Sequence, residues 1–170
     1  MTNRTVPVRE VIECWARREH RKDPGVYTGE FGDASQKALI DIIRLNGPLG
    51  TSRLLWEGDD IEWTHKTLSE HDFHNLRVHK TPPETGWRRI SPDGSLESAA
   101  EHYLSHAEPT GVTGGMNDDL VAEKCLEIGE DGHTEWGPLI LFREEGEQFP
   151  WLLDGNHRAT ALMAELLRGG

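Results

Sequence analysis

The C-terminal part of the sequence constrains the fold most, because two apolar runs are followed there by a helical pattern. Residues 137–142 read GPLILF, residues 150–154 read PWLLD, and the polar turn REEGEQ separates them. Nearly continuous apolar runs of this length are typical of strands that are covered on both faces. Beyond residue 158 the apolar side chains recur at helical spacing. The residues on that helix face are Ala159, Leu162, Met163, Leu166 and Leu167.

The turn DGNHR, which joins the second strand to this helix, raises a question of charge. His157 and Arg158 stand at the end of the helix where the dipole is already positive. A bound anion would resolve the conflict, because the free N–H groups of a helix start point toward the same place. Gly155 would let a ligand approach the backbone, and Asn156 is expected to cap the helix. Asp154 could reach a metal ion held by the anion, or it could simply form an ion pair with Arg158.

Periodicity and turn signals predict the other elements. The expected helices lie over residues 8–16, 36–45, 95–106 and 118–128. Ser35 and Asn117 stand where two of these helices would be capped. The helix over 36–45 is apolar on nearly every side, so it is expected to be largely buried. Short strands are expected over 75–80 and 87–91, and over 52–56 and 60–65, the last two joined as a hairpin.

Charge and composition exclude several classes of protein. The chain has 30 acidic and 18 basic residues and a formal charge of −12, which disfavours binding to nucleic acid. Its two cysteines provide neither a disulfide framework nor a CxxC metal motif, and Cys125 is expected in the core. No apolar run approaches the roughly 20 residues of a membrane span, and no apolar signal region begins the chain. We therefore expect a cytoplasmic protein that does not bind a membrane.

Residues 117–169, including PLILF, WLLD and DGNHR, resemble the core of the ParB/sulfiredoxin-like superfamily. In that superfamily a helix precedes the first strand, and the second strand ends in a G-x-x-R or D-G-x-H-R turn that leads into a helix. The resemblance implies an α/β (α+β) fold with a small mixed sheet in a core domain of residues 51–170, preceded by an N-terminal helical extension of residues 1–50. The resemblance also implies that the turn binds the phosphate groups of a nucleotide. The cofactor-binding residues would be Gly155, Asn156, His157 and Arg158.

The branches of the superfamily differ at this turn. Their activities include CTP-dependent DNA clamping, ATP-dependent reduction of cysteine sulfinate and nucleotide-dependent phosphorylation of free serine. Sulfiredoxins carry a cysteine where this chain has Asn156, so their thiol chemistry is not expected here. The acidic charge disfavours a DNA clamp. The free-serine kinases share the D-G-x-H-R pattern, so the resemblance favours a phosphotransferase that uses ATP, ADP or CTP with Mg²⁺ and acts on a small molecule.

Phosphoryl transfer also requires a group that accepts the proton of the attacking hydroxyl. Asp154 and His157 are the candidates at the turn, and Glu30 and Asp33 are candidates in the glycine-rich loop of residues 22–33. A non-catalytic module that senses a nucleotide or another anion would suit the same corner. The acceptor and the oligomeric state stay open.

Histidines supply a further alternative, a metal-dependent enzyme. The chain has nine histidines, and His102 and His106 have the i, i+4 spacing that can bind a transition metal on a helix. His71 and His74 form a similar pair. Surface histidines are the commoner outcome for such pairs, so the sequence assigns no metal ligand.

Overall fold

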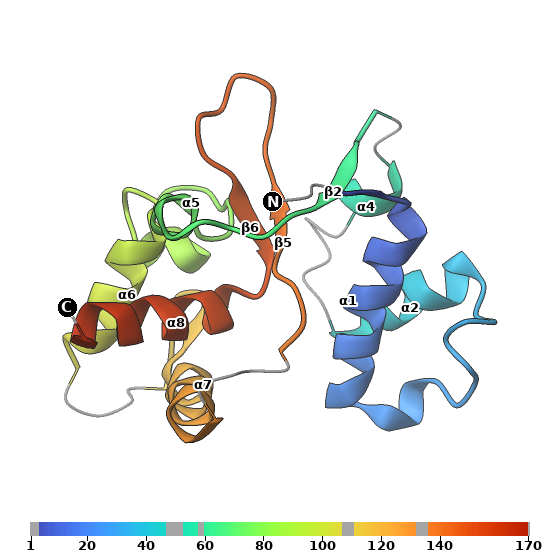
Figure 1. Cartoon of the computed structure of the whole chain (residues 1–170). Helices are drawn as coiled ribbons and strands as arrows, with labels where there is room; N and C mark the ends of the chain where they lie inside the picture. The colour runs from blue at the N-terminus through green and yellow to red at the C-terminus, as the bar shows by residue number, and fades with distance from the viewer. Residues whose placement is uncertain (1–3, 47–52, 58–59, 107–110, 132–135, 170) are drawn as a thin grey trace. The chain divides into compact units, whose positions relative to one another are not determined.

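The computed structural model describes residues 4–46, 53–57, 60–106, 111–131 and 136–169, and it divides the chain into two compact units (Figure 1). The first unit spans Met1–Thr67 and the second spans Leu68–Gly170. We expected a boundary after residue 50. The observed boundary lies later in the chain because a strand near the end of the first unit pairs with the N-terminal strand.

The two longest elements described in the first unit are helices. Helix α1 (Val8–Lys22) confirms the first predicted helix and packs against α2 (Gln36–Asn46). The predicted cap of α2 is also confirmed, because the hydroxyl of Ser35 accepts a hydrogen bond of 3.2 Å from the N–H of Ala38. Burial of α2 is less complete than expected, since Leu45 is 66% exposed. The remaining elements of this unit are β1 (Arg4–Val6), η1 (Pro24–Val26), α4 (Leu54–Glu57) and β2 (Trp63–His65).

The hairpin predicted over residues 52–65 is wrong. Residues Leu54–Glu57 form the short helix α4, and β2 pairs in antiparallel fashion with β1. In this register Val6 lies opposite Trp63, and both side chains are buried. Cross-strand apolar pairs of this kind stabilise a sheet, and their partners can come from distant parts of the chain.

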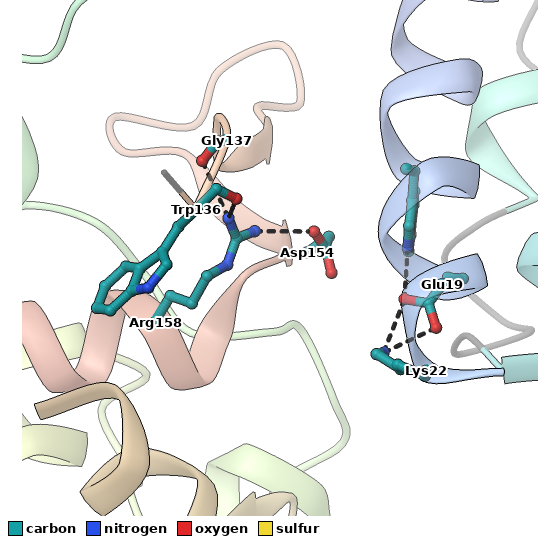
Figure 2. A network of polar contacts seen from close by, with 7 residues as sticks. Glu19, Lys22, Trp136, Gly137, Asp154 and Arg158 are labelled. Atoms are coloured by element: carbon teal, nitrogen blue, oxygen red, sulfur yellow. Dashed lines mark hydrogen bonds and ion pairs between the residues drawn. The ribbon is translucent and has the colours of Figure 1, made fainter. Parts of the chain in front are cut away.

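A buried carboxylate lies in the last part of α1. Glu19 is 1% exposed. Its carboxylate accepts a hydrogen bond of 3.2 Å from the indole Nε1 of Trp15. It also forms an ion pair with Lys22, in which Nζ lies 2.7 Å from Oε2 (Figure 2). A buried charge is tolerated when it is paired and hydrogen-bonded in this way. Glu19 therefore belongs to the packing of the first unit.

In the second unit three helices pack around one hydrophobic core. Helix α8 (Asn156–Gly169) contacts both α6 (Leu96–Leu104) and α7 (Asp118–Asp131) (Figure 1). The predicted cap of α7 is confirmed, because the side chain of Asn117 accepts a hydrogen bond from the N–H of Asp119. Helix α6 is capped as well, by the hydroxyl of Ser95, which accepts a hydrogen bond from the N–H of Ser98. The other elements are α5 (Glu70–His74), η2 (Gly86–Arg89), β3 (Val112–Thr113), β4 (Met116–Asn117), β5 (Ile140–Phe142) and β6 (Trp151–Asp154).

The two predicted C-terminal strands are confirmed as the antiparallel pair β5–β6. The strand predicted over 75–80 is reduced to bridges at Arg77, one of them parallel to Trp151 of β6. The strand predicted over 87–91 is wrong, because residues Gly86–Arg89 form the 3-10 helix η2. Mixed α/β architecture is thus confirmed, but in the described part of the chain the strands form separate two-stranded sheets.

The buried face of α8 differs from the predicted one. Ala159 and Met163 are fully buried as expected, whereas Leu166 is 44% exposed. Alanine and threonine side chains take the place of the leucines, because α8 lies between α6 and α7 and buries a wider face. Cys125 is buried in the same core, as predicted. Of the helices that the structure describes, none is long and apolar enough to cross a membrane.

Candidate functional site

The strand-to-helix corner predicted from the sequence is present at residues 154–158. Strand β6 ends at Asp154, Gly155 has a φ of +94°, and α8 begins at Asn156 (Figure 1). The N–H of Ala159 donates to the carbonyl of Gly155 over 2.9 Å, which closes the first turn. The helix thus begins before His157, and no acidic residue lies in its first turn.

Arg158 is bound on both of its terminal nitrogens. Nη1 donates to the main-chain carbonyls of Trp136 and Gly137 at 2.5 and 3.0 Å, and Nη2 donates to the carboxylate of Asp154 at 3.1 Å (Figure 2). The side chains of Arg158 and Asp154 are 11% and 18% exposed. The ion pair that we considered as the alternative therefore exists, and it connects β6, α8 and the segment that leads into β5.

Gly155 has a steric and a conformational reason to be glycine. A Cβ atom at this position would lie 2.5 Å from the side chain of Leu139 and 2.7 Å from the guanidinium of Arg158. A positive φ also disfavours any side chain. The close approach that we expected of a ligand is therefore made here by protein atoms.

Asn156 was predicted to cap α8, but its side chain binds elsewhere. It is the first residue of the helix, and its side-chain oxygen accepts a hydrogen bond of 2.8 Å from the main-chain N–H of His79. This bond ties the start of α8 to the segment that runs beside β6. The sequence contains no signal for this contact, because its two residues are far apart in the chain.

His157 anchors the start of α7. Its Nε2 accepts a hydrogen bond of 3.0 Å from the main-chain N–H of Asn117, and its ring packs edge-on against Trp87 at 5.1 Å. Because Nε2 accepts an N–H, this nitrogen carries no proton and the neutral ring bears its hydrogen on Nδ1. Proton transfer through Nε2 would first require this bond to break.

The other candidate bases lie in the first unit, whereas the corner belongs to the second. Glu30 and Asp33 are both exposed. The main-chain carbonyl of Glu30 accepts hydrogen bonds from the hydroxyl of Tyr27 and from the N–H of Asp33. These contacts stabilise the loop itself.

The predicted histidine pair, His102 on α6 and His106 just beyond its end, lies near a buried carboxylate. The rings of His102 and His106 pack edge-to-face at 4.8 Å, and Nδ1 of His106 lies 3.7 Å from the carboxylate of fully buried Asp118. Across the described ranges, no group of three or more His, Cys, Asp or Glu residues is arranged to hold a metal ion.

Two histidines give the second unit a predictable response to pH. Burial lowers the pKa of His79, against a backbone hydrogen bond at Leu152 that raises it. Burial, followed by the charge of His106, also lowers the pKa of His102, against Asp118. Such residues bind protons more strongly in the unfolded chain, where the pKa is near 6.5.

We therefore expect the free energy of unfolding of the second unit to fall as the pH is lowered from about 7 through these depressed pKa values. Urea titrations at stepped pH would measure this slope. His79→Gln and His102→Gln should each reduce it. A slope of wild-type size in both variants would show that other groups cause the pH dependence.

The resemblance to ParB and sulfiredoxin-like proteins comes from residues 117–169. In this segment the structure has a helix, two antiparallel strands and a second helix, in the predicted order. The motif turn lies between the last strand and the last helix. The chain as a whole matches no protein-family model, no curated protein and no solved structure.

Proposed function

We propose that this protein binds the phosphate group of a nucleotide at the corner between β6 and α8. The observation that carries the proposal is the guanidinium of Arg158, which two main-chain carbonyls hold at the N-terminal end of a long helix. A guanidinium and the positive end of a helix dipole both attract phosphate. The chain is acidic overall, so an anion would be attracted by this local arrangement and not by the net charge.

Phosphate binding in this proposal requires an exchange of partners at Arg158. Asp154 now neutralises the guanidinium, and the space beside Gly155 contains Leu139 and Arg158. A phosphate would take the place of the Asp154 carboxylate on Nη2, while the bonds from Nη1 to the carbonyls could persist. Asp154 is thus a competitor of the ligand.

His157 and Asp154 are both already bound to other protein groups. This favours a protein that senses a nucleotide by binding it over an enzyme that transfers a proton through these residues. Nε2 of His157 accepts a main-chain N–H, and the carboxylate of Asp154 is already bound to Arg158. A phosphotransferase that uses ATP or ADP is the second candidate. It is favoured by the partial exposure of Asp154, because a carboxylate together with phosphate oxygens is a donor set that fits Mg²⁺.

Calorimetric titration with ATP, ADP and CTP, with and without Mg²⁺, tests the proposal. Wild-type protein is expected to bind at least one of them. Arg158→Lys should weaken binding by about tenfold or more, because the bidentate fork is lost. Arg168→Ala is the matched control, since this arginine lies at the other end of α8 and pairs with Glu165.

Asp154→Asn separates the two candidate roles by the sign of its effect. If Asp154 competes with the phosphate, the variant binds the nucleotide more tightly. If Asp154 holds Mg²⁺ for phosphoryl transfer, the variant binds the Mg²⁺ complex more weakly. A wild-type protein that binds none of the three nucleotides would contradict the proposed function.

A further inference from the structure

We infer that Glu127 on α7 positions Arg158 for its ligand by holding Trp136, so that both residues contribute to anion recognition without touching the anion. This inference rests on the proposed function. It identifies positioning residues outside the DGNHR motif, at a place where the sequence showed no pattern.

The two carbonyls hold the guanidinium of Arg158 through Nη1, whereas Asp154 binds Nη2. Nη1 lies 2.5 and 3.0 Å from the carbonyls of Trp136 and Gly137, so both of its hydrogens have acceptors. The two edges of a guanidinium that bind phosphate bidentately both include Nη2. One of them, the edge formed by Nε and Nη2, does not use Nη1. A ligand on that edge would leave the carbonyl bonds in place, and these bonds would fix the plane and direction of the fork.

The position of these carbonyls depends in turn on α7. The indole Nε1 of Trp136 donates a short hydrogen bond to the carboxylate of Glu127, which also forms an ion pair of 2.5 Å with Lys124. Burial opposes ionisation of Glu127, but the hydrogen bonds from Lys124 and Trp136 outweigh it and hold its pKa below the usual value. The Trp136 ring also packs against the hydrophobic core. A continuous series of contacts thus leads from α7 to the guanidinium.

Precise positioning matters because a charged hydrogen bond weakens quickly when its angle or distance changes. Without the Glu127–Trp136 bond, the carbonyl at residue 136 can rotate, and the fork loses its fixed direction. The charge of Arg158 is unchanged. The effect should therefore appear in affinity for phosphate ligands and act only through an arginine at position 158.

The test measures ATP affinity by calorimetry in Trp136→Phe and Glu127→Ala, which remove the indole–carboxylate bond from either side. Each variant is expected to bind ATP about three- to tenfold more weakly than wild type. Glu127→Gln keeps an acceptor oxygen and should bind nearly as wild type. Trp151→Phe is the matched control. It also removes an indole–carboxylate hydrogen bond in the second unit, to Glu147, but the indole of Trp151 does not hold a carbonyl that binds Arg158.

A double-mutant cycle separates positioning from a merely structural role. In an Arg158→Lys background, Trp136→Phe should cause no further loss of ATP affinity, whereas an equal loss in both backgrounds would overturn the inference. Wild-type affinity in both Trp136→Phe and Glu127→Ala would also overturn it and leave the proposed function intact. Absence of nucleotide binding by wild-type protein would instead contradict the proposed function.

Discussion

Arg158→Ala is expected to lower the free energy of unfolding of the second unit by about 3 kcal/mol. The substitution removes one ion pair and two hydrogen bonds that join β6, α8 and the segment before β5. It also leaves the largely buried carboxylate of Asp154 without its arginine. Urea unfolding followed by tryptophan fluorescence would measure the loss. The prediction concerns stability, so it holds whether or not a ligand binds.

Arg168→Ala provides the comparison for this result. Arg168 is also on α8 and also has a carboxylate partner, but the two side chains are 48% and 34% exposed. Exposed ion pairs contribute at most about 1 kcal/mol, so this variant should unfold almost as wild type. A double-mutant cycle with Asp154→Asn should give a coupling energy with Arg158. Equal losses for the two arginine variants would show that the buried contacts of Arg158 do not stabilise the unit.

Gly155→Ala is expected to lower the free energy of unfolding by about 3 kcal/mol, through backbone strain together with steric overlap. The φ of +94° is unfavourable for alanine. The new methyl group would lie within 2.7 Å of both Leu139 and Arg158, which must then move. Since Arg158 would lose its present geometry, nucleotide affinity should fall as well.

Gly146→Ala isolates the strain from the overlap. Gly146 has a φ of +84°, and a Cβ atom there would meet nothing within 4 Å. This variant should therefore show only the backbone term, of about 1 kcal/mol. The same urea titration compares the two variants. If both substitutions destabilise the protein equally, crowding by Leu139 and Arg158 is not the reason for glycine at position 155.

Local patterns predicted the elements around the corner well. The helical spacing beyond residue 158 and the apolar runs before it predicted β5, β6 and α8, and the structure has all three. The caps at Ser35 and Asn117 were also predicted, because a cap depends on residues within one helical turn. These features arise from neighbours in the sequence, so the sequence alone determines them.

Elements whose partners are distant were predicted poorly. The residues around Trp63 showed a strand pattern, but their partner is β1 and not the neighbouring segment. A strand was predicted over residues 87–91, but residues Gly86–Arg89 form a 3-10 helix. In both cases the competing conformations differ little in local energy, and burial against other elements decides between them.

The residues of the corner show the same difference between features set by sequence neighbours and features set by distant partners. The sequence by itself determined that a strand would turn into a helix at Asp154–Asn156 and that a positive side chain would stand at the helix start. Only the tertiary structure decided what that charge contacts. Arg158 binds Asp154 and two carbonyls, Asn156 binds the N–H of His79, and His157 binds the N–H of Asn117. Buried polar groups must find partners, and the packing of α8 against the rest of its unit determines which partners are within reach.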